Sequence, residues 1–178
     1  PYIPLPGDWE TYLAGIDKKQ RHEIRRKIRR AETGELPVTW YVLQDADQLD
    51  ADIDAFLGLM AQGSEKAVFL SGDMVPYMRQ VMRTAFKEGY LHLSFLEIGG
   101  KKAAAKLCFD YQNRLWGYNS GFNNDFMEYS PGWVLLGYVL AWANEQGREV
   151  FDFMRGNETY KYRFGAVDRF VNLLSLQP

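Results

Sequence analysis

Residues 150–165 read VFDFMRGNETYKYRFG, and this stretch combines a buried strand, a turn and a short helix. Asp152 lies among apolar residues, where an unpaired carboxylate is costly to bury. We expect Lys161 or Arg155 to neutralise it from the short helix predicted over 157–164 or the turn before it. Two interpretations stay open: an internal ion pair that closes the C-terminal part of the fold, and a charged group placed for chemistry.

The segments around this stretch alternate between helices and strands. One helix is predicted to begin with Ser130 at the N-cap and Pro131 at the first helical position, and to end at Gly147. Tight turns and apolar alternation predict antiparallel strands over 90–98, 102–111 and 115–122. The other expected elements are helices over 9–32, 45–60 and 74–88 and strands over 38–43, 149–153 and 167–176. This order predicts an α+β fold, an α/β sandwich in which helices flank one mixed, mostly antiparallel sheet.

Composition places the chain among folded proteins. Hydrophobic residues make up 47% and charged residues 25% of its 178 residues, which excludes a disordered or low-complexity protein. Cys108 is the only cysteine, so intrachain disulfides and cysteine-built zinc sites are excluded. A single cysteine fits a reducing compartment, and we expect a cytoplasmic protein. The longest apolar run, 133–143, is shorter than the roughly 20 residues of a membrane-spanning helix.

The N-terminus has a different character from the rest. Prolines are frequent in residues 1–7, which predicts a linker-like segment. Residues 8–178 show neither an internal repeat nor a second core, so we expect them to form a single domain. The linker-like start indicates that this domain is the C-terminal part of a longer protein.

Positive charge is concentrated in the first predicted helix. Residues 18–30 hold eight of the 21 basic residues and a single acid, Glu23. Arg21, Arg25 and Arg29 recur one turn apart and form a row beside the apolar seam. Such a row is often a solvated face, but this imbalance also favours binding of phosphate or of a polyanion. A non-catalytic module that docks RNA or an anionic surface through this helix therefore stays an alternative to an enzyme.

The usual catalytic motifs are missing. The chain has no GxxxxGK[ST] loop, GxSxG elbow, HExxH pair or strand-anchored GxGxxG. His22 and His92 are isolated from each other, so we expect no histidine-ligated metal. Cys108 follows three alanines and is predicted to be an inert core residue rather than a nucleophile.

A second candidate site precedes the helix that begins after Ser130. The strand end YNSGF (118–122) leads through a loop to SPG (130–132). The first N–H groups of a helix have no intrahelical acceptor and lie in positive dipole potential, which suits a phosphate or an oxyanion. Gly132 would let a ligand approach the backbone closely. A capped helix without a ligand is the alternative interpretation.

Three stretches carry a resemblance to a known family: LEIGGKKAAAKLCFDY (96–111), WGYNSGFNNDFMEYSPGWVLL (116–136) and ANEQGREVFDFMRGNETYKYRFG (143–165). They resemble the GNAT-fold acyltransferases of the CelD/BcsL-like group, which are relatives of the Fem-type peptidoglycan aminoacyltransferases. The likeness covers almost the whole chain, and the pattern FDF…G…YK…FG is its most specific part. One departure is that SPG replaces the [RQ]-x-x-G-x-[GA] pyrophosphate loop of ordinary acetyl-CoA-dependent members.

The resemblance implies a GNAT-like fold and an N-acyltransferase in which an acceptor amine attacks the donor carbonyl directly. Acyl-CoA, such as acetyl-CoA, is the expected donor, without a metal; in Fem-type relatives the donor is an aminoacyl-tRNA, which stays an alternative. The expected acceptor is a small-molecule or polysaccharide-precursor amine. The expected catalytic residues are Lys161 for negative charge, Asp152 to position Lys161 or accept a proton through water, and Tyr160 to shape the acceptor side. The residues expected to bind the donor are Tyr118, Asn119, Ser120, Ser130 and Gly132, and those expected to bind phosphate or substrate are Arg21, Arg25, Arg29 and Arg155.

Overall fold

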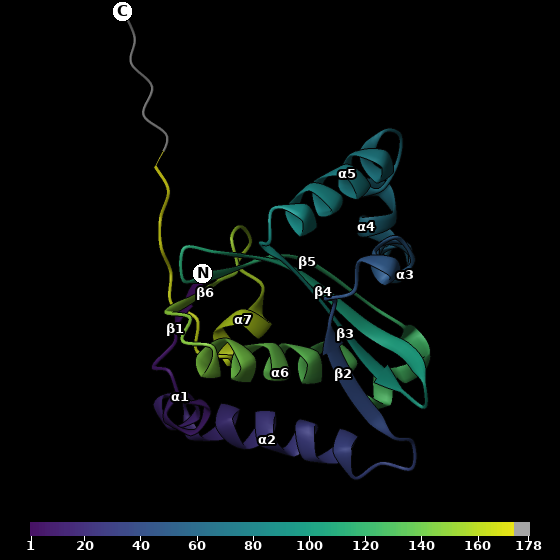
Figure 1. The fold of residues 1–178 in the computed structure, drawn as a ribbon. Coiled ribbons are helices and arrows are strands. Elements are labelled where there is room, and N and C mark those ends of the chain that lie inside the picture. The colour runs from purple at the N-terminus through teal and green to yellow at the C-terminus, as the bar shows by residue number, and fades with distance from the viewer. Residues whose placement is uncertain (173–178) are drawn as a thin grey trace, which may run out of the picture.

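The computed structural model describes residues 1–172, which build one six-stranded sheet with helices on both faces (Figure 1). The strand order is β1-β6-β5-β4-β3-β2. Within the described chain, β5 and β6 form the one parallel pair, so the predicted mixed, mostly antiparallel sheet is confirmed. The strands are β1 (Tyr2–Pro4), β2 (Val38–Val42), β3 (Leu91–Ile98), β4 (Lys101–Tyr111), β5 (Arg114–Phe122) and β6 (Val150–Asp152).

The helices form two groups, one on each face of the sheet (Figure 1). One group contains α1 (Trp9–Gly15), α2 (Lys18–Glu32), α6 (Pro131–Glu145) and α7 (Thr159–Arg163). The other contains α3 (Leu49–Ala61), α4 (Ser64–Phe69) and α5 (Met74–Lys87), after the 3-10 turn η1 (Ala46–Gln48). Because side chains alternate along a strand, Ala104 and Cys108 of β4 enter the core under α6, whereas Ala105 and Leu107 enter the core under α3 and α5. No helix in the described part of the chain has the length and apolar character needed to cross a membrane.

The predicted helix over 9–32 is wrong in one respect, because it is two helices. The C-cap of α1, Ile16, is extended, and Asp17 then caps α2. The Asp17 carboxylate accepts hydrogen bonds from the N–H groups of Lys19 (3.0 Å) and Gln20 (3.3 Å). These bonds satisfy donors that a new helix leaves free, so the chain can turn here at little cost.

Both chain ends also differ from the predictions. Residues 1–7 were expected to be linker-like, but Tyr2–Pro4 pairs antiparallel with β6 and buries Ile3 in the core. The strand expected over 167–176 is also wrong where it can be compared. Val167 makes a single bridge to Tyr2, residues 168–172 continue without regular structure, and residues 173–176 lie outside the described chain.

The feature that positions the candidate site is the separation of β5 from β6. The two strands pair from Arg114 opposite Val150 to Trp116 opposite Asp152, and β5 then continues to Phe122 without β6 beside it. A bulge at Tyr118 bends β5, because Leu107 and Cys108 of β4 lie opposite Asn119 and Gly117. The sheet therefore opens between β5 and the segment that follows β6.

Candidate active site

A cavity of about 360 Å³ lies against the half of β5 that has no β6 neighbour. Its walls come from β4, β5, α6, the loop before α6 and the start of α7 with the segment before it, and α2 and α4 add one side chain each. Four residues predicted for the site line it: Ser120, Ser130, Gly132 and Tyr160. The structure therefore brings together the two candidate sites that lie far apart in sequence.

The first turn of α6 offers few groups to a ligand. Ser130 occupies the predicted N-cap position, but in the left-handed conformation (φ 52°, ψ 52°) and without the expected capping hydrogen bond. Its carbonyl accepts from the N–H groups of Trp133 (3.0 Å) and Val134 (3.1 Å). Pro131 has no N–H, so Gly132 holds the one N–H of this turn that finds no acceptor among residues 1–172. That N–H and the Ser130 hydroxyl remain for a ligand.

Three lysines line the cavity, and none of them was among the predicted site residues. Lys27 of α2 lies 4.3 Å above the centre of the Trp133 ring, and burial lowers the pKa of Lys27. Lys66 of α4 donates a hydrogen bond to the Ser120 carbonyl, and burial lowers the pKa of Lys66 as well. Lys106 of β4 is 6% exposed. Lys106 has a signal in the sequence, because it is the one charged residue in the run AAAKLCF. Lys27 belongs to the basic segment 18–30 that favours phosphate binding, whereas Lys66 has no such signal.

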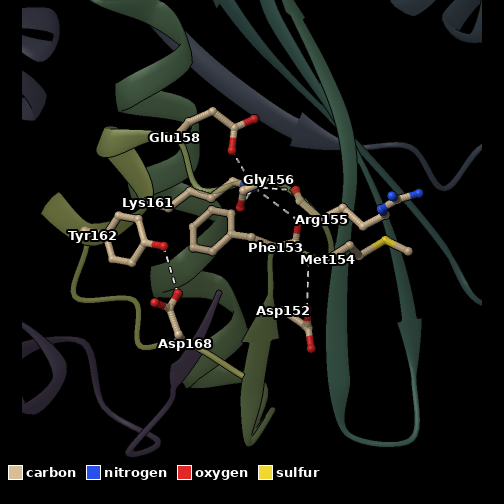
Figure 2. Close-up of polar contacts among 9 residues, drawn as sticks. All are labelled: Asp152, Phe153, Met154, Arg155, Gly156, Glu158, Lys161, Tyr162 and Asp168. Atoms are coloured by element: carbon tan, nitrogen blue, oxygen red, sulfur yellow. Dashed lines mark hydrogen bonds and ion pairs between the residues drawn. The ribbon is translucent and has the colours of Figure 1, made fainter. Parts of the chain in front are cut away.

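Lys161 does not line the cavity. Its ammonium group donates to the carbonyl oxygens of Arg155 (2.8 Å) and Gly156 (3.0 Å) and pairs with the Glu158 carboxylate at 2.8 Å (Figure 2). A weaker contact joins it to the Phe153 carbonyl at 3.5 Å. With a residue exposure of 3%, Lys161 thus ties the segment between β6 and α7 into a closed loop.

The expected pairing of Lys161 with Asp152 is wrong. Asp152 is the last residue of β6, and its carboxylate turns back to accept the N–H of Met154 at 2.7 Å (Figure 2). Glu158 is the ion-pair partner instead. Burial, the largest single effect, raises the pKa of Glu158, but the hydrogen bond from Lys161, the backbone hydrogen bond and the charges of Lys161 and Lys66 together leave that pKa below its usual range. The acid that faces the cavity is therefore held as a carboxylate.

Tyr160 is the predicted catalytic residue that does reach the cavity. Burial raises the pKa of its phenol to about 12. The hydroxyl therefore stays protonated at neutral pH and can donate a hydrogen bond to an oxygen on which negative charge develops.

The remaining predicted residues lie outside the cavity lining. Arg21 donates to the carbonyls of Leu13 (3.4 Å) and Ala14 (3.1 Å) and so closes the end of α1, and Arg25 pairs with Glu10. The other four do not reach the cavity either; they are Arg29, Tyr118, Asn119 and Arg155. These residues are therefore not placed to contact a donor or a phosphate that is bound in this cavity.

Two further groups are buried away from the cavity. Cys108 is fully buried, and burial raises the pKa of its thiol to about 12, which agrees with the predicted inert core role. His92 packs against the Trp142 ring at 4.4 Å, and burial lowers the pKa of His92 to about 4. Among residues 1–172, no cluster of His, Cys, Asp and Glu has an arrangement that could hold a metal ion.

Comparison with known proteins gave one family and several solved structures. The family described as an acetyltransferase (GNAT) domain matches residues 18–162. A search of curated protein sequences gave no match. FemX is similar over 89% of this chain and 53% of its own, with a TM-score of 0.67 and 12% identity.

Two smaller proteins match over nearly their whole length. A possible acetyltransferase from Clostridium difficile 630 has a TM-score of 0.57 and 13% identity over 81% of this chain and 99% of its own. An aminoglycoside acetyltransferase from an uncultured soil metagenomic sample, in complex with sisomicin, has a TM-score of 0.53 and 12% identity over 79% and 97%. At such identities the likeness shows a shared fold. This chain spans about half of FemX.

Proposed function

Because this chain belongs to the family of GNAT acetyltransferase domains, we propose that it moves an acyl group from acyl-CoA to an acceptor amine in the cavity beside β5. The acceptor nitrogen attacks the carbonyl carbon of the donor directly. The new C–N bond forms, the C–S bond breaks, and the thiol of coenzyme A leaves. The acceptor belongs to the class of small-molecule or polysaccharide-precursor amines.

The position of the cavity is the observation that carries this proposal. The cavity lies between the first turn of α6 and the half of β5 that has no β6 neighbour. An extended donor arm can lie along the free edge of a strand, such as the edge of β5 beyond β6, and a helix N-terminus suits the phosphates of the donor. Three lysines line the same cavity against one acid, Glu158, which is already paired. This excess of positive charge fits a donor that carries phosphate groups.

Three hydrogen-bond donors of the cavity share two tasks in this scheme. The free N–H of Gly132 and the Ser130 hydroxyl face the phosphates. The protonated Tyr160 hydroxyl donates to the carbonyl oxygen as it becomes negative. Removing one such donor lowers turnover by about 10²–10³-fold in enzymes that form an oxyanion.

An aminoacyl-tRNA donor is the second candidate. Among residues 1–172, the first turn of α6 leaves a single N–H free, and one backbone donor is few for binding a pyrophosphate. An aminoacyl ester needs no pyrophosphate contact at this point, and FemX shares the fold over 89% of this chain. The non-catalytic polyanion module has less support, because Arg21 and Arg25 are engaged within the protein.

The proposal is tested by mixing the protein with acetyl-CoA and a panel of primary amines, and by measuring thiol release and the mass of acylated products. Gly132→Leu should abolish both, because its side chain projects into the cavity from a position with only Phe122 nearby, at 3.6 Å. Gly58→Leu is the matched control, since a side chain there meets nothing within 4 Å and lies on the exposed face of α3. Transfer that survives Gly132→Leu would contradict this location. Consumption of aminoacyl-tRNA but not of acyl-CoA would favour the second candidate.

A further inference from the structure

Two buried lysines meet at the ring of Phe153, next to the cavity. The Nζ atom of Lys161 lies 5.5 Å from the centre of that ring, and the Nζ of Lys106 lies 6.0 Å from it. Lys106 is also 5.4 Å from the centre of the Phe151 ring. Burying one ammonium ion is expensive, and a second positive charge nearby adds repulsion. One of the two amines is therefore expected to give up its proton.

Hydrogen bonding decides which lysine keeps its charge. Lys161 has a carboxylate and backbone carbonyls around its ammonium group, and all of these stabilise the protonated form. The Nζ of Lys106 contacts no carboxylate and no hydrogen-bond acceptor within residues 1–172. The faces of the two phenyl rings attract a cation, but this attraction does not replace the hydration that a buried ion without a hydrogen-bonding or charged partner loses.

The ionisable groups around Lys106 act in the same direction. Burial lowers the pKa of Lys106 most, and the charge on Lys161 lowers it further. An ionised Cys108 would raise it, but that thiol stays neutral because burial raises its own pKa to about 12. The cavity also presents Lys66, Lys27, Tyr160 and Glu158 from the surrounding elements. Glu158 is the one acid among them, and its carboxylate is held by Lys161.

We propose that Lys106 rests as a neutral amine in the cavity and accepts the proton that the acceptor amine loses during acyl transfer. This inference rests on the proposed function. The acceptor nitrogen bonds to the carbonyl carbon, and its proton moves to the Nζ of Lys106. The C–S bond then breaks with its electron pair on sulfur, and Lys106 returns the proton to the thiolate. With an ester donor, the leaving oxygen takes that proton instead.

The charge state of Lys106 can be measured without any substrate. In protein labelled with ¹³C-lysine, the Cε signal of each lysine follows its protonation, and the Lys106→Met variant assigns the signal. We expect Lys106 to be deprotonated at neutral pH, while the exposed lysines of the same sample stay protonated. A Lys106 that is still protonated at neutral pH would overturn the proposal. If Lys106→Met fails to fold, Lys106→Arg gives the same assignment.

The role in transfer needs a second measurement. Lys106→Met and Lys106→Arg should each lower kcat by about 10²-fold or more, as loss of a general base does, with little change in the KM for the donor. The wild type should lose activity as pH falls through the pKa of Lys106, and neither variant should show that limb. Lys101→Met, at the exposed first residue of β4, is the control.

These experiments distinguish a failure of the proposed function from a failure of the inference about Lys106. If no amine is acylated from acetyl-CoA, the acyl-CoA proposal fails, while the titration still decides the state of Lys106. If transfer occurs and Lys106→Arg retains the wild-type rate and pH profile, the inference about Lys106 is wrong and the proposed function stands.

Discussion

Replacing Lys161 with Met should destabilise the protein strongly. The substitution removes the hydrogen bonds to the carbonyls of Arg155 and Gly156 and the ion pair with Glu158. Each hydrogen bond to a charged group contributes about 1.5–3 kcal/mol. The Glu158 side chain is 58% exposed, so its pair with Lys161 is screened and adds little. Met fills most of the volume and needs no hydration, which offsets part of the loss, so we expect a net cost of about 3 kcal/mol.

The assay is thermal unfolding followed by circular dichroism. For a chain of this size, 1 kcal/mol shifts Tm by about 2–4 °C, so Lys161→Met should lower Tm by roughly 6–12 °C. Glu158→Gln is the matched variant and should cost less than about 1 kcal/mol, because it keeps the backbone acceptors of Lys161 in place. A Tm of Lys161→Met within about 2 °C of the wild type would refute this reasoning. It would return Lys161 to the charge-stabilising role that the family resemblance implies.

Three further predictions concern other parts of the fold. Gly121→Ala should cost about 3 kcal/mol or more in a denaturant titration, because a Cβ there lies 2.4 Å from the backbone of Leu59 and Met60, which cannot move aside; a wild-type midpoint would contradict this packing. Cys108→Ser should keep most of the transfer activity, and the native thiol should react slowly with thiol reagents because it is fully buried; an acyl group on Cys108 in an intact mass spectrum during turnover would contradict direct attack. Folding lowers the pKa of His92 from 6.5 to about 4, so between these pH values the unfolded chain binds more protons than the folded chain. The free energy of unfolding should therefore fall by up to about 3 kcal/mol as pH falls from 6.5 to 4. An equal loss in His92→Leu would show that another group is responsible.

Local patterns predicted most of the sheet. The strands over 90–122 follow from apolar alternation and tight turns, which depend on neighbours in sequence. The edge strand β1 was missed because three residues show no period, and only its partner β6 defines it. The break at Asp17 has a signal, since Asp is a favoured N-cap, but the apolar spacing that continues from Leu13 and Ile16 to Ile24 hides it.

Part of the candidate site could also be predicted from the sequence. Ser130, Gly132 and Tyr160 lie in motifs with local signals, and the fold brings them to one cavity. The partners of Lys161 are mostly backbone carbonyls, which leave no trace in the sequence. Lys106 is visible as a charged residue in an apolar strand, but its lack of a counter-ion depends on tertiary packing.

The most direct test of acyl transfer at the β5–β6 separation is a crystal structure with a non-hydrolysable acetyl-CoA analogue. We predict that its phosphates contact the Gly132 N–H and that its carbonyl group lies in the cavity lined by Lys106 and Tyr160. An analogue that binds elsewhere and leaves this cavity empty would contradict the proposed site, and so would the absence of any binding at saturating analogue.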